Sequence, residues 1–205
     1  GNSAEAETVF ETGFLGTEWK GAWYEPEQEA TEPSTDYSDG EGLDVTVAVS
    51  EDEKTERDFH EFRPSQYIRI PITLEGEIQK ARVYMTAHGV YRLYVNGIRP
   101  DDREFAPEIT AYQDFLQYQT YDVTKLLKAG RNILGVILAD GWWVGRVGLT
   151  GDCCQYGTTL GLLMQTEITY IDGRTCIYSA KDGVSSTGPL NASMTYLGIS
   201  LKSSR

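Results

Sequence analysis

Apolar and polar residues alternate with a period of two through most of the chain beyond residue 65. Within residues 160–170 the even-numbered positions are mostly apolar, and the odd-numbered positions from Gln165 to Thr169 are polar. This alternation is typical of a β-strand that buries one face and exposes the other. The same signal, together with short apolar runs, predicts strands at residues 45–49, 66–74, 78–87, 91–95, 118–123, 132–138, 160–170 and 174–179.

Turn-forming dipeptides separate several of these segments. Asn96-Gly97 tolerates the positive φ angles of a tight hairpin turn, and Asp172-Gly173 does the same between the last two predicted strands. One short helical signal interrupts the strands, because Asp122 can cap a single turn through Lys128 that Gly130 then ends.

These signals predict an all-β domain, an antiparallel two-sheet β-sandwich that forms a jelly roll over residues 45–190. Residues 1–44 contain prolines and a turn-forming cluster at 38–42, which predicts an irregular lead-in. This lead-in is too aromatic for a disordered tail, so we expect it to wrap against the sandwich. The aromatic residues concerned are Phe10, Phe14, Trp19, Trp23 and Tyr24.

The net charge of −13 lies in the first third of the chain. Residues 1–66 carry 18 acidic and 4 basic side chains, whereas residues 67–205 carry 13 and 14. Nucleic acid is not expected as a partner, because no basic face is available to neutralise phosphates. The acidic lead-in indicates a solvated surface or, alternatively, attraction of a divalent cation.

Membrane and metal signals are weak. No run of about 18 apolar residues could span a bilayer, and the first residues lack the pattern of a secretory signal. Cys153 and Cys154 are adjacent and rarely bridge each other without strain, so a single disulfide to Cys176 would leave one thiol over. The two histidines, His60 and His88, lie far apart, and no zinc-ligand spacing occurs.

Several motifs together carry a family resemblance. They are residues 10–14 (FETGF) and 18–23 (EWKGAW), 81–97 with its Asn-Gly turn, 106–107 and 110–112, 117–124 (QYQTYDVT), 138–146 (LADGWWVGR), 167–173 and 186–189. In this combination the chain resembles the N-terminal β-sandwich module of bacterial α-L-rhamnosidases over residues 10–24 and 66–190. In that comparison, 81–97 is similar to a hairpin of the module. The tail at 191–205 diverges from it.

The resemblance implies a galactose-binding-domain-like jelly roll from a bacterial periplasmic or extracellular protein. In the family, the two carboxylates that glycoside hydrolysis requires sit in a separate α-helical barrel, for which this chain has no room. The resemblance therefore implies no enzymatic activity for this chain alone. It also implies two partners, a rhamnose-containing oligo- or polysaccharide and a catalytic domain.

The best candidate for ligand binding is a cluster of aromatic, amide and charged residues. An aromatic ring can stack on the apolar face of a sugar while polar groups meet its hydroxyls. Strand alternation predicts that one ring of the tandem tryptophan points inward and the other outward. Alternatively, both rings plug one end of the sandwich. The candidate residues are Tyr112, Gln117, Tyr118, Asp140, Trp142, Trp143 and Arg146.

A second group, Asn96, Asp101 and Asp102, offers clustered oxygen atoms that suit calcium, although ordinary turn chemistry is the favoured explanation. No other cofactor is expected. Nothing indicates that the carboxylates of residues 101–108 face one another as a catalytic pair. His88 is expected to be a packed residue, because no serine or cysteine lies near it.

Three functions remain open. The first is a non-catalytic carbohydrate-recognition module that binds rhamnose-containing glycans. The second is a structural spacer that packs against a catalytic domain. The third is a fragment of a glycoside hydrolase with residual activity.

Overall fold

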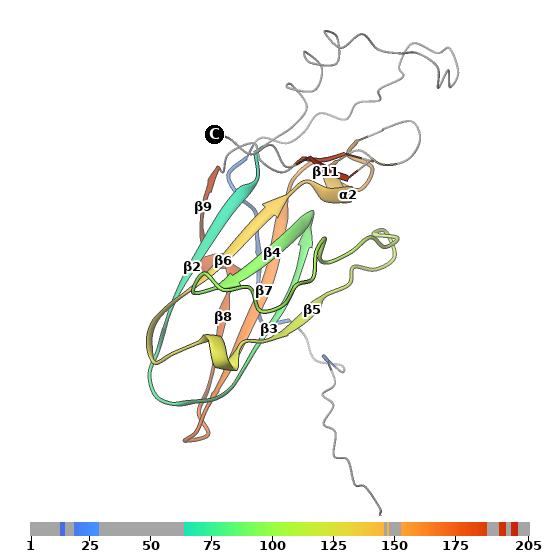
Figure 1. Cartoon of the computed structure of the whole chain (residues 1–205). Helices are drawn as coiled ribbons and strands as arrows, with labels where there is room; N and C mark the ends of the chain where they lie inside the picture. The colour runs from blue at the N-terminus through green and yellow to red at the C-terminus, as the bar shows by residue number, and fades with distance from the viewer. Residues whose placement is uncertain are drawn as a thin grey trace, which may run out of the picture.

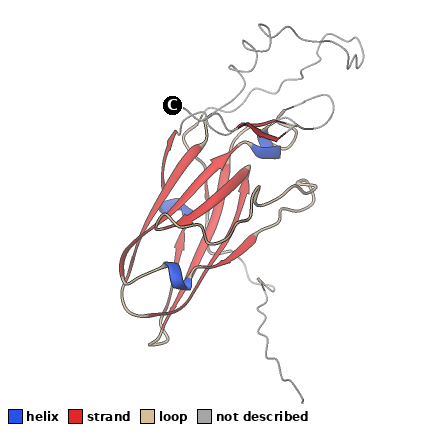
Figure 2. Cartoon of the chain, viewed as in Figure 1, coloured by secondary structure: helices blue, strands red, loops and turns tan. Residues whose placement is uncertain are grey.

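Two antiparallel β-sheets packed face to face, with a separate two-stranded sheet, form the computed structural model, which describes residues 13–14, 19–28, 64–145, 147, 153–187, 193–195 and 198–200 (Figure 1). Figure 2 shows that strands form both layers and that the helical turns lie in the connections from one strand to the next. The elements are β1 (Trp23–Tyr24), β2 (Gln66–Leu74), β3 (Ile78–His88), β4 (Val90–Val95), β5 (Gln119–Asp122), η1 (Thr124–Leu126), β6 (Gly130–Ala139), α2 (Gly141–Val144), β7 (Gly161–Tyr170), β8 (Thr175–Ser179), η2 (Ala180–Asp182), β9 (Val184–Thr187), β10 (Ser193–Thr195) and β11 (Gly198–Ser200).

The first sheet has the order β1-β7-β3-β5, and β8 also pairs with β7. The second sheet has the order β4-β6-β2-β9. Every strand pair is antiparallel. The predicted all-β, two-sheet sandwich is confirmed. The strand predicted at residues 45–49 lies outside the described residues, and β1, β9, β10 and β11 have no counterpart among the predicted strands.

The core lies between the two sheets and follows the period-two pattern of the sequence. Along β2, buried and exposed residues alternate without exception. Burial of such aliphatic side chains stabilises a fold by roughly 1.5–3 kcal/mol each. The largest fully buried side chains come from both sheets and include Ile68, Ile70, Met85, Leu134, Leu138, Leu162 and Met164.

The outer face of β7 is where the alternation rule fails. Gln165 was expected to face water, yet only 1% of its surface is exposed. Its side-chain Oε1 accepts hydrogen bonds from the backbone N–H groups of Lys20, at 2.6 Å, and Gly21, at 3.0 Å. The chain before β1 therefore covers this face, and the buried amide is satisfied by backbone donors that a pattern of single residues does not reveal.

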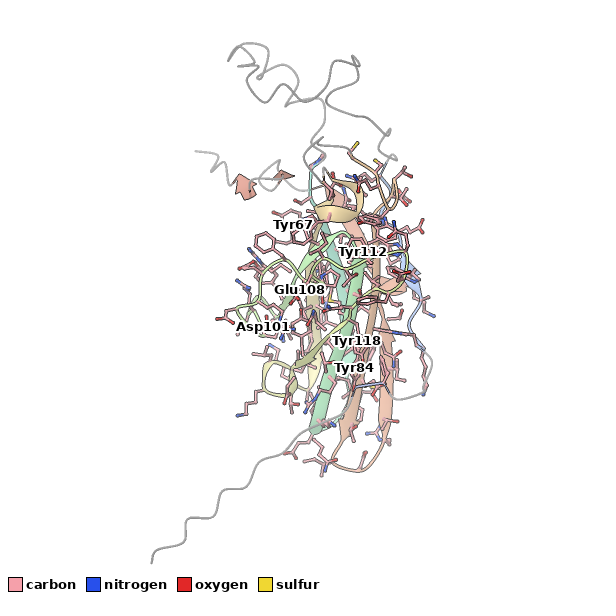
Figure 3. All side chains as sticks on the ribbon, turned by 90° about the vertical axis from the view of Figure 1, so that its right-hand side faces the viewer. Tyr67, Tyr84, Asp101, Glu108, Tyr112 and Tyr118 are labelled. Carbon is pink, nitrogen blue, oxygen red and sulfur yellow. The ribbon has the colours of Figure 1, made fainter. Side chains whose placement is uncertain are left out.

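Aromatic side chains extend this cover along the first sheet. The ring of Phe14 lies 4.2 Å from that of Tyr84 and 5.5 Å from that of Tyr118. Trp19 packs edge-on against Phe14 at 5.0 Å. Figure 3 shows Tyr84 and Tyr118 next to each other. Phe10, which was expected to join this contact, lies outside the described residues.

Gly89 marks the point where the chain changes sheets. The expectation that residues 81–97 form a hairpin is wrong, because β3 pairs with β5 and β7 whereas β4 pairs with β6. Gly89 has φ of +132°, and a Cβ atom there would lie 2.4 Å from the carbonyl oxygen of Ala139. Only glycine combines this left-handed backbone with so close an approach.

The predicted turns are confirmed. Asn96 and Gly97 have φ of 51° and 85°, and Val95 and Ile98 exchange two backbone hydrogen bonds across them. Gly173 has φ of 83° between β7 and β8. The predicted helical turn after Asp122 exists as the short 3₁₀ element η1, and the Asp122 carboxylate accepts a hydrogen bond from the Thr124 N–H at 3.0 Å.

The three cysteines form no disulfide, so the bridge that their number allowed is absent. Cys176 has no disulfide, and its sulfur lies 3.5 Å from the Tyr170 hydroxyl. The sulfur atoms of Cys153 and Cys154 lie 3.7 Å apart, well beyond an S–S bond of about 2.05 Å.

Within the part of the chain that the structure describes, no helix is long and apolar enough to cross a lipid bilayer.

Candidate functional site

The tandem tryptophans lie on α2, a single helical turn that follows β6 at one end of the sandwich (Figure 1). The Val144 N–H donates to the Asp140 carbonyl at 3.3 Å, and the Gly145 N–H donates to the Gly141 carbonyl at 3.1 Å. The side chain of Val144 is buried and anchors the turn. The expectation of a loop with strand-like alternation is therefore wrong, since successive helical side chains are about 100° apart.

Trp143 is a packing residue. Its ring stacks on the imidazole of His88 at 3.9 Å with an interplanar angle of 6°, and Trp23 stacks on His88 at 4.0 Å. We call these three rings the ring column. Tyr112 and Tyr156 also approach Trp143, at 5.5 Å and 6.3 Å. The ring column ties α2 to β3 and β1, so Trp143 corresponds to the alternative in which an indole plugs the end of the sandwich.

Trp142 points to different neighbours. Its ring is half-buried and lies 6.0 Å from that of Phe105, of which 37% is exposed. Asp140 precedes the turn and is also half-buried. The two tryptophans have different neighbours, although both are half-buried, and Trp142 is the one placed beside exposed aromatic surface.

Tyr112 belongs to this end of the molecule, whereas Tyr118 does not. The Tyr112 ring is buried against Trp143, and its hydroxyl donates to the Glu108 carbonyl at 2.9 Å. Burial, reinforced by nearby Tyr156, raises the pKa of Tyr112 to about 12. Tyr118 lies on the outer face of the first sheet, where its hydroxyl accepts a hydrogen bond from the Phe14 N–H at 2.8 Å (Figure 3).

Two of the predicted ligand-binding residues remain, Gln117 and Arg146. The side chain of Gln117 is exposed, and the backbone carbonyl of this residue accepts a hydrogen bond from the Thr86 hydroxyl at 2.6 Å. Arg146 lies outside the described residues. The structure thus brings Tyr112, Trp142, Trp143 and Asp140 to one end of the sandwich, while Tyr118 serves to hold the lead-in.

In the candidate calcium group, the side chains of Asn96 and Asp101 form hydrogen bonds with neighbouring backbone and side-chain groups. The Asn96 amide donates to the carbonyl of Leu126 and to the side chain of Asn132, both at 2.9 Å, and its Oδ1 accepts from the Ile133 N–H at 3.0 Å. Asp101 accepts from the Arg103 N–H at 3.2 Å. Among the described residues, no group of three or more His, Cys, Asp or Glu side chains is arranged to hold a metal ion.

Glu104, in the same acidic stretch, is paired with two arginines. It forms ion pairs with Arg92 and, at 2.8 Å, with Arg99. Although partial burial opposes it, hydrogen bonding to Arg92 and Arg99 lowers the pKa of Glu104. A glycosidase acid needs the opposite shift, because it must remain protonated to donate to the leaving group.

Sequence reasoning expected His88 to be a packed residue, as it is, but it placed neither His88 nor Tyr156 and Phe105 at this end of the molecule. His88 forms the centre of the ring column, Tyr156 packs edge-on against Tyr112 at 4.8 Å, and Phe105 faces Trp142. Phe105 has φ of 59°, which is uncommon for a bulky residue and could not be read from composition. The sequence contained one indication of this role for His88. The residue lies at the end of β3 and on the same face of the strand as Tyr84 and Thr86, which are buried.

The position of His88 predicts a pH dependence of stability. Burial lowers its pKa from 6.5, an effect that Glu25 only partly opposes. The folded chain therefore binds this proton less tightly than the unfolded chain, and its contribution to stability is present above pH 6.5 and is lost as the pH falls through the lowered pKa. We expect His88→Phe, which keeps a stacked ring, to flatten the fall in the free energy of unfolding between about pH 7 and 5. Urea denaturation at several pH values measures this, and an unchanged slope would contradict it.

The described residues define a class, an antiparallel β-sandwich with an aromatic cluster at one end. The family model of the alpha-L-rhamnosidase N-terminal domain matches residues 76–201, and the chain belongs to this family.

Similar proteins support this membership. The α-L-rhamnosidase of Streptomyces avermitilis is 34% identical over 189 residues, which are 86% of this chain and 17% of that protein. The crystal structure of native α-L-rhamnosidase from Aspergillus terreus has a TM-score of 0.65 and 29% identity, covering 83% of this chain and 17% of that one. The Streptomyces avermitilis enzyme complexed with L-rhamnose has a TM-score of 0.60 and 37% identity, covering 62% of this chain and 12% of that one. The chain therefore spans less than a fifth of these relatives.

Proposed function

We propose that this chain is a non-catalytic accessory domain of an α-L-rhamnosidase that binds rhamnose-containing glycans at the end of the sandwich bearing α2. The observation that carries the proposal is that the tandem tryptophans contact different rings. Trp143 fixes α2 through the ring column, and this leaves Trp142 held beside Phe105 at the surface. A rigid, half-exposed indole is a suitable platform for the apolar face of a 6-deoxy sugar, and Asp140 lies next to it to meet hydroxyl groups.

The experiment is a titration of the 205-residue chain with rhamnose and rhamnogalacturonan fragments, followed by NMR of the indole N–H signals. We expect weak binding, in the millimolar range, because a single shallow platform buries little area. Trp142→Ala should weaken binding by about tenfold, equivalent to ~1.4 kcal/mol. Ile171→Ala, which removes an exposed side chain from the turn between β7 and β8, away from both proposed sites, is the control. If millimolar sugar shifts neither indole signal, the proposal fails.

The structural spacer is a second candidate, and one observation favours it. The loop between β4 and β5 exposes Phe105, Ile109 and Phe115 by 37%, 50% and 57%. Exposed apolar residues on one loop are typical of a surface that contacts another protein domain. In a whole α-L-rhamnosidase containing this domain, a spacer role predicts that Phe115→Ser lowers the thermal midpoint while rhamnoside binding to the isolated chain remains undetectable.

Residual hydrolysis is the weakest candidate. The ion pairs with Arg92 and Arg99 stabilise the charged form of Glu104, whereas a glycosidase acid must be protonated. Incubation of the chain with a chromogenic rhamnoside tests it. Turnover above that of Trp142→Ala would require a pair of opposed carboxylates and would overturn the non-catalytic assignment.

A further inference from the structure

A shallow groove crosses the outer face of the second sheet. It has a volume of about 770 Å³ and is lined by β2, β4, β6 and the start of β9. The strand register explains its shape. Val184, Arg69, Gly135 and Tyr94 form one row across the four strands, since Arg69 pairs with both Val184 and Gly135, and Gly135 pairs with Tyr94. The glycine leaves the middle of this row without a side chain, so its backbone is the floor of the groove.

Two arginines in the groove differ from the other described arginines in their ion pairing. Of the arginines that the structure describes, Arg82, Arg92, Arg99, Arg103 and Arg174 each lie within 4.0 Å of a carboxylate. Arg69 and Arg131 form no ion pair with any described residue, and both line the groove. Two arginines on one face of the sheet, without a carboxylate partner among the described residues, favour an anionic ligand.

The other lining residues indicate which kind of anion. Tyr67, 38% exposed, and Tyr94 add ring faces and hydroxyl groups, and Val184 adds apolar surface at the rim. The strand spacing places the backbones of Tyr67 and Tyr94 roughly 12 Å apart, two strands and two residues from each other, which suits an extended ligand. Aromatic rings spaced in this way can each stack on a separate sugar ring.

The hydrogen-bonding groups of the groove suit an acidic saccharide. Of its lining residues that the structure describes, the polar side chains are arginine and tyrosine, and none is Asp, Glu, Asn, Gln or His. The backbone groups of β6 are already paired with β2 and β4, so these side chains make the polar contacts. The carboxylate and ring oxygens of an acidic sugar can accept from the guanidinium groups, and its hydroxyls can exchange hydrogen bonds with the tyrosine hydroxyls.

We propose that this groove is a second binding site, specific for uronic-acid-containing oligosaccharides. The guanidinium groups of Arg69 and Arg131 pair with uronate carboxylates, and the sugar rings lie across Gly135 between Tyr67 and Tyr94. The proposal is independent of rhamnose binding at α2, because the two sites share no residue.

The test is calorimetric titration of the 205-residue chain with a short galacturonic acid oligomer and, as the uncharged equivalent, with its methyl ester. We expect the acid form to bind at least about tenfold more tightly than the ester, and added salt to weaken it. Arg69→Gln and Arg131→Gln should each weaken binding about fivefold or more, while Arg174→Gln, at an arginine paired with Asp172, should not.

Gly135→Val fills the groove without disturbing the sheet. A Cβ atom at this position would meet only Tyr94, at 3.8 Å or more, so the thermal midpoint should be kept while binding is lost. Trp142→Ala should leave uronate binding unchanged, which separates this site from the rhamnose site. Equal affinity for acid and ester, or unchanged binding by Gly135→Val, would overturn the proposal. Tighter binding of a peptide with the acidic sequence of residues 29–63, lost in Arg69→Gln, would assign the groove to a polypeptide and overturn it too.

Discussion

Replacing Gly89 with alanine is expected to lower the free energy of unfolding by about 3 kcal/mol or more. Two effects add at this position. The backbone has φ of +132°, a region that residues with a side chain rarely adopt, and the new Cβ would lie 2.4 Å from the Ala139 carbonyl oxygen. That oxygen belongs to the end of β6, whose pairing with β4 begins at Val90. The clash cannot be relieved without moving the strand that the chain has just entered.

Urea denaturation measures this effect, and Gly135→Ala is the matched control. Both glycines lie in the sandwich, but Gly135 has room for a Cβ atom and should change stability by no more than about 0.5 kcal/mol. If the two variants were equally stable, the sheet change at Gly89 would not require glycine. The connection between β3 and β4 would then be more adaptable than its geometry indicates.

The same glycine shows where sequence reasoning reaches its limit. Period-two alternation located β2, β3, β6 and β7 because each has one face in the core, and burial imposes this pattern locally. Whether two consecutive strands pair or pass to opposite sheets depends on partners far away in sequence. Gly89 was therefore compatible with a hairpin until the pairing of β4 with β6 was known.

Gln165 and α2 illustrate a second limit. A polar residue on a strand face predicts exposure, but Gln165 is buried because the backbone of Lys20 and Gly21 supplies donors from 144 and more residues away. The end that carries α2 was identified from its aromatic composition, which is local information. The roles of its two indoles were not, since His88 and Tyr156 reach Trp143 through the fold.

This difference between the two indoles gives the second large prediction. Trp143→Ala is expected to lower the free energy of unfolding by about 3 kcal/mol, within the range for removing a large aromatic side chain from packed surroundings. The substitution removes the His88 stack at 3.9 Å and the contacts with Tyr112 and Tyr156. The partner rings then lose their common neighbour, so β1 loses part of its hold on the sheet end through Trp23.

Trp142→Ala is the matched control, because it removes an identical side chain one position away on the same helical turn. Its only ring contact with a described residue is Phe105 at 6.0 Å, so the expected loss is below about 1 kcal/mol. Equilibrium urea unfolding of both variants, followed by far-ultraviolet circular dichroism, compares them directly. A larger loss in Trp142→Ala would reverse the two roles, making Trp142 the structural residue and removing the basis for placing a sugar on it. The order of the two stabilities therefore tests the assignment of the site without any ligand.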